Sequence, residues 1–335
     1  MNEFLQAAME SGVTDVHFIH DGVYVRKNGK LDKVAGVQWT AADLLAFFQH
    51  QGVAVQDDFA VSLFGRRVRV HRYQTYHGPA WALRFLPGQV PDLQGLHLPD
   101  QLAQLATEKS GLILLTGPTG SGKSTSLAAM LKHRAAAGGH LMTFERPVEY
   151  LLASDEALIT QTELTADEAL APLLAAALRA DPDVIMVGEI RTAEAAKGVL
   201  YLAETGHLVM TTLHSADVVQ ALMRLLHLID AEERPLWQGI LAEVLRGVVA
   251  QTLISSPLTD GLLPVAEVLL QSEGLARQIR DGAWSLIAQS LENQGGGLSF
   301  EAHLANHVQR GLLDAADAFQ LARHPERLTI LLGMS

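Results

Sequence analysis

One stretch decides how this chain folds: Gly117-Pro118-Thr119-Gly120-Ser121-Gly122-Lys123-Ser124-Thr125. It matches the pattern G-x-x-x-x-G-K-[ST], in which Gly117 and Gly122 permit the tight turns that direct backbone N–H groups at phosphate oxygens. Lys123 places a positive charge on the β- and γ-phosphates, and the hydroxyl of Ser124 can ligate Mg²⁺. The stretch therefore predicts that residues 117–125 bind ATP together with Mg²⁺.

The sequence on either side of this loop predicts a strand before it and a helix after it. Residues 112–116 form a short apolar run that is typical of a buried parallel strand. Residues 124–136 have helical spacing and end before Gly138-Gly139, where a helix is expected to stop. Further strands are predicted at 141–144, 184–187 and 208–212. Strands that alternate with helices favour an α/β fold with a mostly parallel sheet.

The first hundred residues are predicted to form a separate, small α/β unit. Its expected elements are strands at 13–19, 23–25, 61–70 and 81–86, a hairpin turn at Asp21-Gly22 and a helix at 41–50. Pro87-Gly88 and Pro91-Asp92 then interrupt the pattern, which indicates a boundary in this region. We expect an N-terminal domain over 1–95 and a second domain over 96–335. The tail from about residue 230 is predicted to be mainly helical, with a loop at Gly295-Gly296-Gly297.

The composition of the 335-residue chain excludes several classes of protein. An apolar content of 48% argues against disorder, and the absence of cysteine excludes disulfides, thiol catalysis and cysteine-ligated zinc. No basic N-terminal signal peptide and no long apolar span are found, so we expect a cytoplasmic protein that reaches a membrane only through a partner. The net charge of −12 disfavours a general nucleic-acid binder.

Acidic residues follow two of the predicted strands. The strand at 184–187 ends in Gly188-Glu189, and a carboxylate at such a position suits Mg²⁺ binding and water activation in an ATPase. Glu189 is therefore the first candidate for the catalytic residue. Glu145 and Glu149 end another strand, but acids at strand ends are common, so taken alone their signal is weak.

Histidines and arginines also occur at notable positions, but from the residues alone a structural role is favoured for them. His207 and His214 flank the predicted strand at 208–212, where they would face opposite sides or lie at its ends. That spacing makes a shared metal ion improbable. Arg67, Arg69 and Arg84 lie on predicted N-terminal strands and are expected to be solvated.

Taken together, these segments resemble the secretion-ATPase superfamily that powers type IV pili and type II secretion, most closely its PilT-like pilus-retraction branch. The resembling segments are Thr14-Asp15-Val16-His17, the arginine-bearing strands at 66–87, the Asp box at 143–150, the Walker B region at 177–191, the His box at 203–215, and the C-terminal helices at 245–254 and 300–322. The resemblance thus covers nearly the whole chain.

This resemblance implies a PAS-like N-terminal domain, a RecA-like ATPase domain with C-terminal helices, and a homo-hexameric ring. Glu189 would be the Walker B glutamate, which also serves Mg²⁺, and Glu145 its acidic partner in the Asp box. His207 and His214 would sense nucleotide and couple it to subunit packing. Arg69 and Arg84 would reach the γ-phosphate when the N-terminal domain closes, as arginine fingers do. Arg224, in the helix after the His box, is a further site candidate.

Three departures from the family pattern bear on activity. Arg146 replaces the aspartate of the E-D-P sequence in the Asp box, and this change of charge could slow or regulate hydrolysis. Thr192 stands where the residue after G-E-h-R is usually aspartate. The retraction signature A-I-R-N-L-I-R-E-G is matched only in part by residues 274–282. The missing cysteines, in contrast, exclude the zinc-binding insertion of assembly and type II secretion ATPases.

The preferred interpretation is a hexameric motor for pilus retraction that acts on an inner-membrane pilus platform protein, at the periphery of that membrane. A pilus-assembly or type II secretion motor, or a weakly hydrolysing accessory ring member that works with a related ATPase, remain alternatives. A nucleic-acid translocase is disfavoured by the charge of −12.

Overall fold

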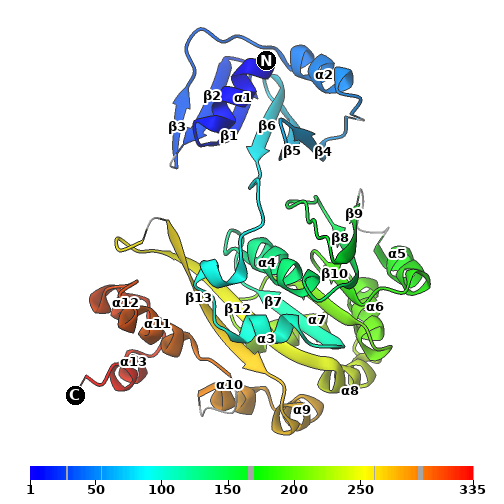
Figure 1. Ribbon diagram of the computed structural model, residues 1–335, viewed down its shortest axis with the longest axis vertical. Coiled ribbons are helices and arrows are strands. Elements are labelled where there is room, and N and C mark those ends of the chain that lie inside the picture. Colours follow the sequence, from blue (N-terminus) through cyan, green and yellow to red (C-terminus); the bar gives the residue numbers. More distant parts are fainter. Residues whose placement is uncertain (28, 54, 165–169, 260, 293–296, 335) are drawn as a thin grey trace. The chain divides into compact units, whose positions relative to one another are not determined.

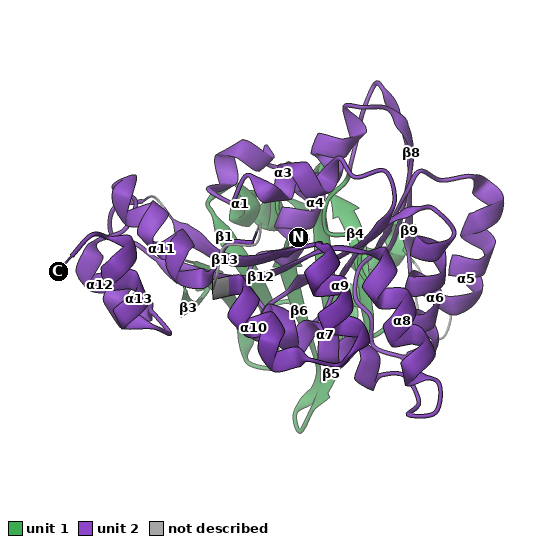
Figure 2. Cartoon of the chain, turned by 90° about the horizontal axis from the view of Figure 1, so that it is seen from below, with its two compact units in different colours: residues 1–90, 146–151 green, residues 91–145, 152–335 purple. Residues whose placement is uncertain are grey.

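The computed structural model describes residues 1–27, 29–53, 55–164, 170–259, 261–292 and 297–334. The chain divides into two compact units (Figures 1 and 2). Unit 1 consists of residues 1–90 with 146–151, and unit 2 of residues 91–145 with 152–335. Unit 1 therefore includes a short segment, 146–151, that is inserted in sequence within unit 2.

Unit 1 is an antiparallel sheet with two helices. Its elements are α1 (Asn2–Glu10), β1 (Val13–Ile19), β2 (Gly22–Lys27), β3 (Lys30–Lys33), α2 (Ala41–His50), β4 (Asp58–Leu63), β5 (Arg66–Thr75) and β6 (Gly78–Phe85). Among the described residues the strands form one sheet in the order β3-β2-β1-β6-β5-β4. Leu5 of α1, Phe48 of α2 and Trp81 of β6 are fully buried in its core, so both helices pack on the same face of the sheet.

The single strand predicted at 61–70 is wrong, because the chain reverses direction within it. β4 and β5 form a hairpin in which Leu63 pairs with Arg66. The two residues between them, Phe64 and Gly65, have positive φ angles of 51° and 74°, as two-residue hairpin turns require. The usual sequence signals for such a turn are Asn-Gly and Asp-Gly, and this turn has Phe-Gly instead. Because phenylalanine seldom adopts a positive φ, the sequence does not indicate a turn here.

Unit 2 is a large α/β unit. Its strands are β7 (Gly111–Thr116), β8 (Gly139–Glu145), β9 (Ala157–Glu163), β10 (Val184–Val187), β11 (Leu208–Thr212), β12 (Leu245–Ser255) and β13 (Leu262–Leu270). Its helices are α3 (Gln101–Ala106), α4 (Lys123–Ala135), α5 (Leu170–Ala177), α6 (Ala193–Glu204), α7 (Val218–His227), α8 (Arg234–Val244), α9 (Glu273–Arg280), α10 (Trp284–Glu292), α11 (Phe300–Gln309), α12 (Ala315–Leu321) and α13 (Pro325–Leu331).

The larger sheet has the order β13-β12-β7-β11-β10-β8-β9, and all neighbours except β12 and β13 run parallel. The predictions of a mostly parallel sheet and of strands at 112–116, 184–187 and 208–212 are therefore confirmed. Alternate residues of β7 belong to two different cores. Leu112 and Leu114 pack with α5 to α10, whereas Ile113 and Leu115 pack with α3 and α4. Figure 2 shows these two helical layers above and below the sheet.

The expectation that residues 245–254 form a helix is wrong, since they form most of β12. This strand pairs in parallel with β7 and in antiparallel with β13, so it is buried on both sides. Its run of Val248, Val249 and Ala250 favours a central strand, because β-branched side chains pack well on a pleated sheet. Helices then resume at α9, and the predicted loop at 295–297 lies mostly outside the described residues.

The outer edge of β13 is covered by the segment we call the C-terminal arm, residues 298–334, which contains α11, α12 and α13 (Figure 1). Leu298 forms a β-bridge with Val268. Further along the strand, the backbone N–H of Ala266 donates to Nδ1 of His303 at 2.9 Å, and Nε2 of His307 donates to the carbonyl oxygen of Pro264 at 2.8 Å. The two histidines thus satisfy backbone groups that an uncovered edge strand would expose.

This arrangement predicts that acid weakens the fold through His303. Burial, with a smaller contribution from His307, lowers the pKa of His303 to about 3. The unfolded chain, with a histidine pKa near 6.5, therefore binds more protons between pH 6.5 and 3. We expect the free energy of unfolding to decrease as pH falls through this window, by up to about 1.4 kcal/mol per pH unit for this residue.

Thermal unfolding of the wild type and of His303→Asn at pH 7 and pH 5 measures this effect. The amide oxygen of the substituted side chain can accept from Ala266 but does not titrate, so the variant should lose less stability on acidification than the wild type does. Equal losses in the two proteins would contradict the assignment.

Candidate nucleotide site

The phosphate loop connects the end of β7 to the start of α4, as the sequence predicts. Gly117, Gly120 and Gly122 have positive φ angles of 146°, 78° and 86°, and Gly122 is the N-cap of α4. The N–H groups of Gly120 and Gly122 donate no hydrogen bond to any residue that the structure describes. Such N–H groups at a helix N-terminus suit a phosphate anion.

The loop is held in shape by Gln251 of β12, a residue that the sequence does not single out. Its Nε2 donates to the carbonyl oxygen of Ser121 at 2.7 Å, and its Oε1 accepts from Oγ of Ser126 at 2.7 Å. Gln251 is 4% exposed, so both hydrogen bonds are shielded from water. The sequence does show that Gln251 is the one polar residue in the otherwise apolar run of residues 248–251. It does not show what Gln251 binds, because its hydrogen-bond partners are about 125 residues away in sequence.

Lys123 lies inside the loop that it belongs to. Its Nζ donates to the carbonyl oxygens of Gly117 and Pro118 at 2.8 and 2.9 Å. Ser124 is exposed in the first turn of α4. An ammonium within the loop, the N–H groups of Gly120 and Gly122 and an accessible hydroxyl are the groups that a Mg²⁺-bound triphosphate requires, so these residues fit that ligand.

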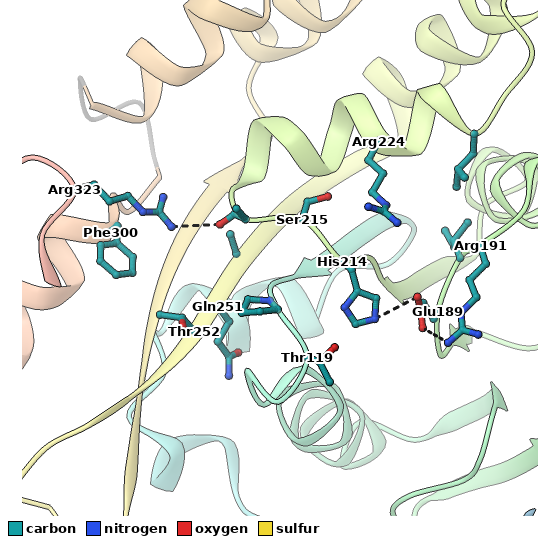
Figure 3. Close-up of a pocket in the computed structure, with 15 residues that line it drawn as sticks. Thr119, Glu189, Arg191, His214, Ser215, Arg224, Gln251, Thr252, Phe300 and Arg323 are labelled. Carbon is teal, nitrogen blue, oxygen red and sulfur yellow. Dashed lines mark hydrogen bonds and ion pairs between the residues drawn. The ribbon is translucent and has the colours of Figure 1, made fainter. Parts of the chain in front are cut away.

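Glu189 lies at the carboxyl end of the same sheet and is gripped by two side chains (Figure 3). Its Oε1 is 3.2 Å from Nε2 of His214, and its Oε2 accepts from Nη2 of Arg191 at 2.8 Å. The neighbouring strands β10 and β11 bring these residues together, because Glu189 follows β10 and His214 follows β11. The loop after β10 is also tied to Thr212, whose carbonyl oxygen accepts from the N–H of Ile190 at 3.2 Å.

The environment of Glu189 keeps its carboxylate ionised. Burial alone would raise its pKa, but the hydrogen bonds and positive charges of Arg191 and His214 outweigh burial and lower the pKa below its usual value. An anionic carboxylate at neutral pH can orient a water molecule or ligate a cation.

A cavity of about 870 Å³ opens beside Glu189, large enough for a nucleotide. It is lined by Pro118 and Thr119 of the phosphate loop, Glu189, Ile190, Arg191, residues 214–216, Arg224, Leu228, residues 250–252, Phe300 and Arg323 (Figure 3). The guanidinium of Arg224, on α7, makes no hydrogen bond or ion pair with the residues that the structure describes. The cavity therefore combines the phosphate loop, one carboxylate and the guanidinium of Arg224, which suits a polyphosphate.

The other predicted acid and histidine, Glu145 and His207, are not among these lining residues. Glu145 ends β8, and its Oε1 accepts from Oγ1 of Thr143 at 2.6 Å and from Nε2 of Gln161 at 3.1 Å. His207 precedes β11, so that strand places it at the opposite end from His214, more than about 15 Å away. Its Nδ1 lies 3.2 Å from Oγ1 of Thr205. Within unit 2, the structure joins Glu189 with His214 but not with His207.

Arg69 and Arg84 lie opposite each other on β5 and β6 of unit 1. Each is engaged by a carboxylate of the same unit. Arg69 donates from Nε and Nη2 to the two oxygens of Asp58, at 3.2 and 2.8 Å, and Arg84 donates from Nε to Asp15 at 2.7 Å. Burial raises the pKa of Asp15, but the hydrogen bond and charge of Arg84 outweigh burial, so the pKa lies below its usual value.

Two departures from the family pattern have definite places. Thr192 is the N-cap of α6, where its hydroxyl accepts from the N–H of Ala195 at 3.2 Å; aspartate, usual in the family, caps helices equally well. Arg146 follows the last residue of β8 and opens the segment 146–151 that belongs to unit 1. Within that unit, Nε of Arg67 donates to the carbonyl oxygen of Val148 at 3.1 Å.

No helix in the described part of the chain has the length and apolar character needed to cross a lipid bilayer. In the same residues, no group of three or more histidine and acidic side chains is arranged as a metal site. A magnesium ion that is held largely by substrate phosphates and water, as Mg²⁺ commonly is, needs no such group.

Comparison with known proteins identifies relatives over most of the chain. Residues 59–287 match the family described as "Type II/IV secretion system protein". The chain is 39% identical over 281 residues to YggR of Escherichia coli K12, and this match covers 82% of this chain and 85% of that protein. It is 32% identical over 277 residues to the type IV pilus retractation ATPase PilT of Pseudomonas aeruginosa PAO1, and this match covers 81% of this chain and 80% of that protein. A crystal structure of the pilus retraction motor PilT with bound ADP superposes with a TM-score of 0.86 at 29% identity, over 98% of this chain and 99% of that one.

Proposed function

This chain belongs to the type II/IV secretion system protein family and is an ATPase of that family, and we propose that it powers the retraction of a type IV pilus. The expected resemblance to PilT-like ATPases is thereby confirmed. Retraction is the activity named for the PilT of Pseudomonas aeruginosa and for the PilT structure that superposes over almost the whole chain.

One observation carries the hydrolytic part of the proposal: Glu189 lies between His214 and Arg191 in the wall of a cavity that the phosphate loop also lines. ATP with Mg²⁺ supplies the reactive γ-phosphoryl group and the cation that neutralises its charge. Lys123 would hold the β- and γ-phosphates, and Ser124 would ligate the cation. Glu189 would orient and deprotonate the attacking water and would also serve the Mg²⁺ ion, with Glu145 as a second acid.

His214 gives the site a way to register whether the nucleotide is intact. Its Nε2 is already 3.2 Å from Glu189, so a γ-phosphate beside that carboxylate would meet the imidazole as well. Loss of the phosphate on hydrolysis removes that contact. A contact that exists in only one nucleotide state is what a conformational change requires.

We further propose that the protein works as a homo-hexamer in which Arg69 and Arg84 of one subunit reach the γ-phosphate of a neighbour. Their ion pairs with Asp58 and Asp15 would hold the guanidinium groups in place until the ring assembles. Arginines that neutralise the transferring phosphoryl group are worth several orders of magnitude in rate. His207 would take part in subunit packing.

Mixed rings test whether the site is shared between subunits. Glu189→Gln chains and Arg69→Ala/Arg84→Ala chains should each be almost inactive alone. After the two are mixed, some interfaces combine an intact Glu189 with intact arginines, so ATP turnover should recover to about a quarter of the wild-type rate if subunits mix at random. A mixture with no more activity than its components would contradict the shared site.

The partner of this ring would be an inner-membrane pilus platform protein, so the motor would lie at the cytoplasmic periphery of that membrane. A related ATPase could share the same platform. Nucleic acid is not an expected partner, because the net charge is −12. Stimulation of ATP turnover by single-stranded or duplex DNA would contradict this expectation.

Pilus number in a deletion strain decides the direction of force. Extra pili, returned to normal by the wild-type gene and not by the Glu189→Gln gene, are expected for a retraction motor. A loss of pili would identify an assembly motor instead. An unchanged pilus number and unchanged secretion would refute the proposal that this chain drives a pilus.

A further inference from the structure

We propose that Arg323 of the C-terminal arm is a positioning residue of the nucleotide site. It holds residues 214–218, which we call the His214 segment, in place beside Glu189. This inference rests on the proposed ATPase function and assigns a part of the site to a segment far from the phosphate loop in sequence. Arg323 follows α12 and lines the same cavity as Thr119, Glu189 and His214 (Figure 3).

The guanidinium of Arg323 is fixed by three contacts. Its Nη1 is 3.1 Å from Oε2 of Glu267, its Nη2 donates to the carbonyl oxygen of Ala216 at 3.3 Å, and its Cζ lies 4.5 Å from the centre of the Phe300 ring. The backbone of the same residue donates to Oε1 of Glu301 at 3.0 Å. The cation is therefore directed at the segment that follows His214, and the ion pair with Glu267 and the contact with Phe300 hold it there.

Glu267, the carboxylate partner of Arg323, also contacts the His214 segment through a hydrogen bond of its own. Its Oε1 accepts from the backbone N–H of Val218, the first residue of α7, at 3.2 Å. Glu267 is 8% exposed, and burial raises its pKa above the usual value. Removing Arg323 would therefore leave a buried acid without its cation, and would weaken the hold on residues 216–218 at both points.

The opposite side of the His214 segment is anchored to the phosphate-loop strand. Oγ1 of Thr116, the last residue of β7, accepts from the N–H of Ser215 at 2.8 Å and donates to the carbonyl oxygen of the same residue at 3.0 Å. Residues 214–218 are thus held between β7 on one side and Arg323 with Glu267 on the other. His214 stands at the start of this doubly anchored segment.

The consequence for catalysis follows from what Arg323 touches. It contacts neither the phosphate loop nor Lys123, so its removal should leave the grip on the phosphates intact. It should instead release the backbone around Ala216 and loosen the imidazole of His214 against Glu189. Small displacements of a catalytic group reduce turnover strongly, so kcat should decrease about tenfold while KM for ATP changes little.

The experiment compares steady-state ATP turnover in the full-length chain with Arg323→Ala, Arg323→Lys and Arg310→Ala. Arg310 lies in the same arm, at the end of α11 and outside the cavity, so its variant controls for the loss of a positive charge from the arm. We expect Arg323→Ala to lower kcat about tenfold at unchanged KM, Arg323→Lys to recover part of the loss, and Arg310→Ala to stay within about twofold of the wild type.

A double-mutant cycle with His214→Ala tests whether Arg323 acts through His214. If it does, adding Arg323→Ala to His214→Ala should lower kcat by less than about twofold, because the group that Arg323 positions is already gone. Independent, multiplicative losses would overturn the inference. So would an unchanged kcat in Arg323→Ala, or an equal loss in Arg310→Ala.

Two further measurements separate this result from misfolding and from failure of the proposed function. The unfolding temperature and the affinity for ADP should be close to wild type in Arg323→Lys, so a lower kcat there cannot come from a lost fold. A wild-type chain without ATP turnover would refute the proposed function itself. Wild-type turnover together with an unaffected Arg323→Ala variant would refute only the role of Arg323.

Discussion

A Glu189→Gln variant is expected to bind ATP nearly as well as the wild type and to hydrolyse it at least about a hundredfold more slowly. Glutamine has the shape of glutamate and can keep a hydrogen bond to Arg191 or His214, so the local structure should persist. The amide cannot accept a proton from the attacking water, and it no longer offers a negative charge to Mg²⁺. Phosphate release at saturating ATP and the affinity for a fluorescent ATP analogue are the two measurements.

A matched control for this prediction is Glu194→Gln, which removes a negative charge from an exposed position in the first turn of α6. Its turnover should stay within about twofold of the wild type, since Glu194 is exposed and does not line the cavity. If Glu189→Gln retained wild-type turnover, the base would have to be another residue, and Glu145 would be the next candidate.

A Gly117→Ala variant is expected to lose most of its nucleotide binding. At this position φ is 146°, a conformation that alanine rarely adopts. The added Cβ would overlap the backbone carbonyl oxygen of Gln251 and lie 2.6 Å from Oγ of Ser121. The Ser121 hydroxyl can rotate away, but the Gln251 carbonyl belongs to the backbone, so the loop itself must move, and we expect ATP affinity to fall at least about a hundredfold.

Gly120→Ala is the matched control for Gly117→Ala. Gly120 also has a positive φ, 78°, but a Cβ there would meet no atom within 4 Å. It should therefore incur only the conformational cost of about 1–2 kcal/mol, and lose about tenfold in affinity. Equal losses in the two variants would show that backbone strain alone, and not the contact with Gln251, makes Gly117 necessary.

The parts of the fold that can be predicted from sequence are those in which a local pattern decides the outcome. The five-residue apolar run that precedes the glycine loop has the length of a strand and is too short for a typical helix. Its prediction as a buried strand is confirmed, as are those of β10 and β11. The hairpin at Phe64-Gly65 escapes prediction because its first turn residue adopts a positive φ that phenylalanine seldom accepts. The helix expected at 245–254 is wrong, since a short, fully buried apolar run has no periodicity that separates helix from strand.

The candidate site shows the same division between local and distant information. Glu189 is recognisable because it follows a strand, and the structure places His214 on it through the neighbouring strand β11. Gln251 and Arg323 are not recognisable from sequence, because their roles depend on partners more than a hundred residues away. No local pattern distinguishes a glutamine that supports a loop from one that faces solvent.

The inserted segment 146–151 has a consequence for how force could pass through the molecule. Because this segment belongs to unit 1, the backbone crosses between the two units at three places: 90/91, 145/146 and 151/152. Unit 1 is therefore discontinuous, and no single cut can separate it from the ATPase unit. Any rotation of one unit against the other must be absorbed at three hinges, one of which directly follows Glu145 at the end of β8. A domain movement would in this way displace the main chain of Glu145, a candidate catalytic acid. Force on unit 1 could therefore change the position of that candidate catalytic side chain.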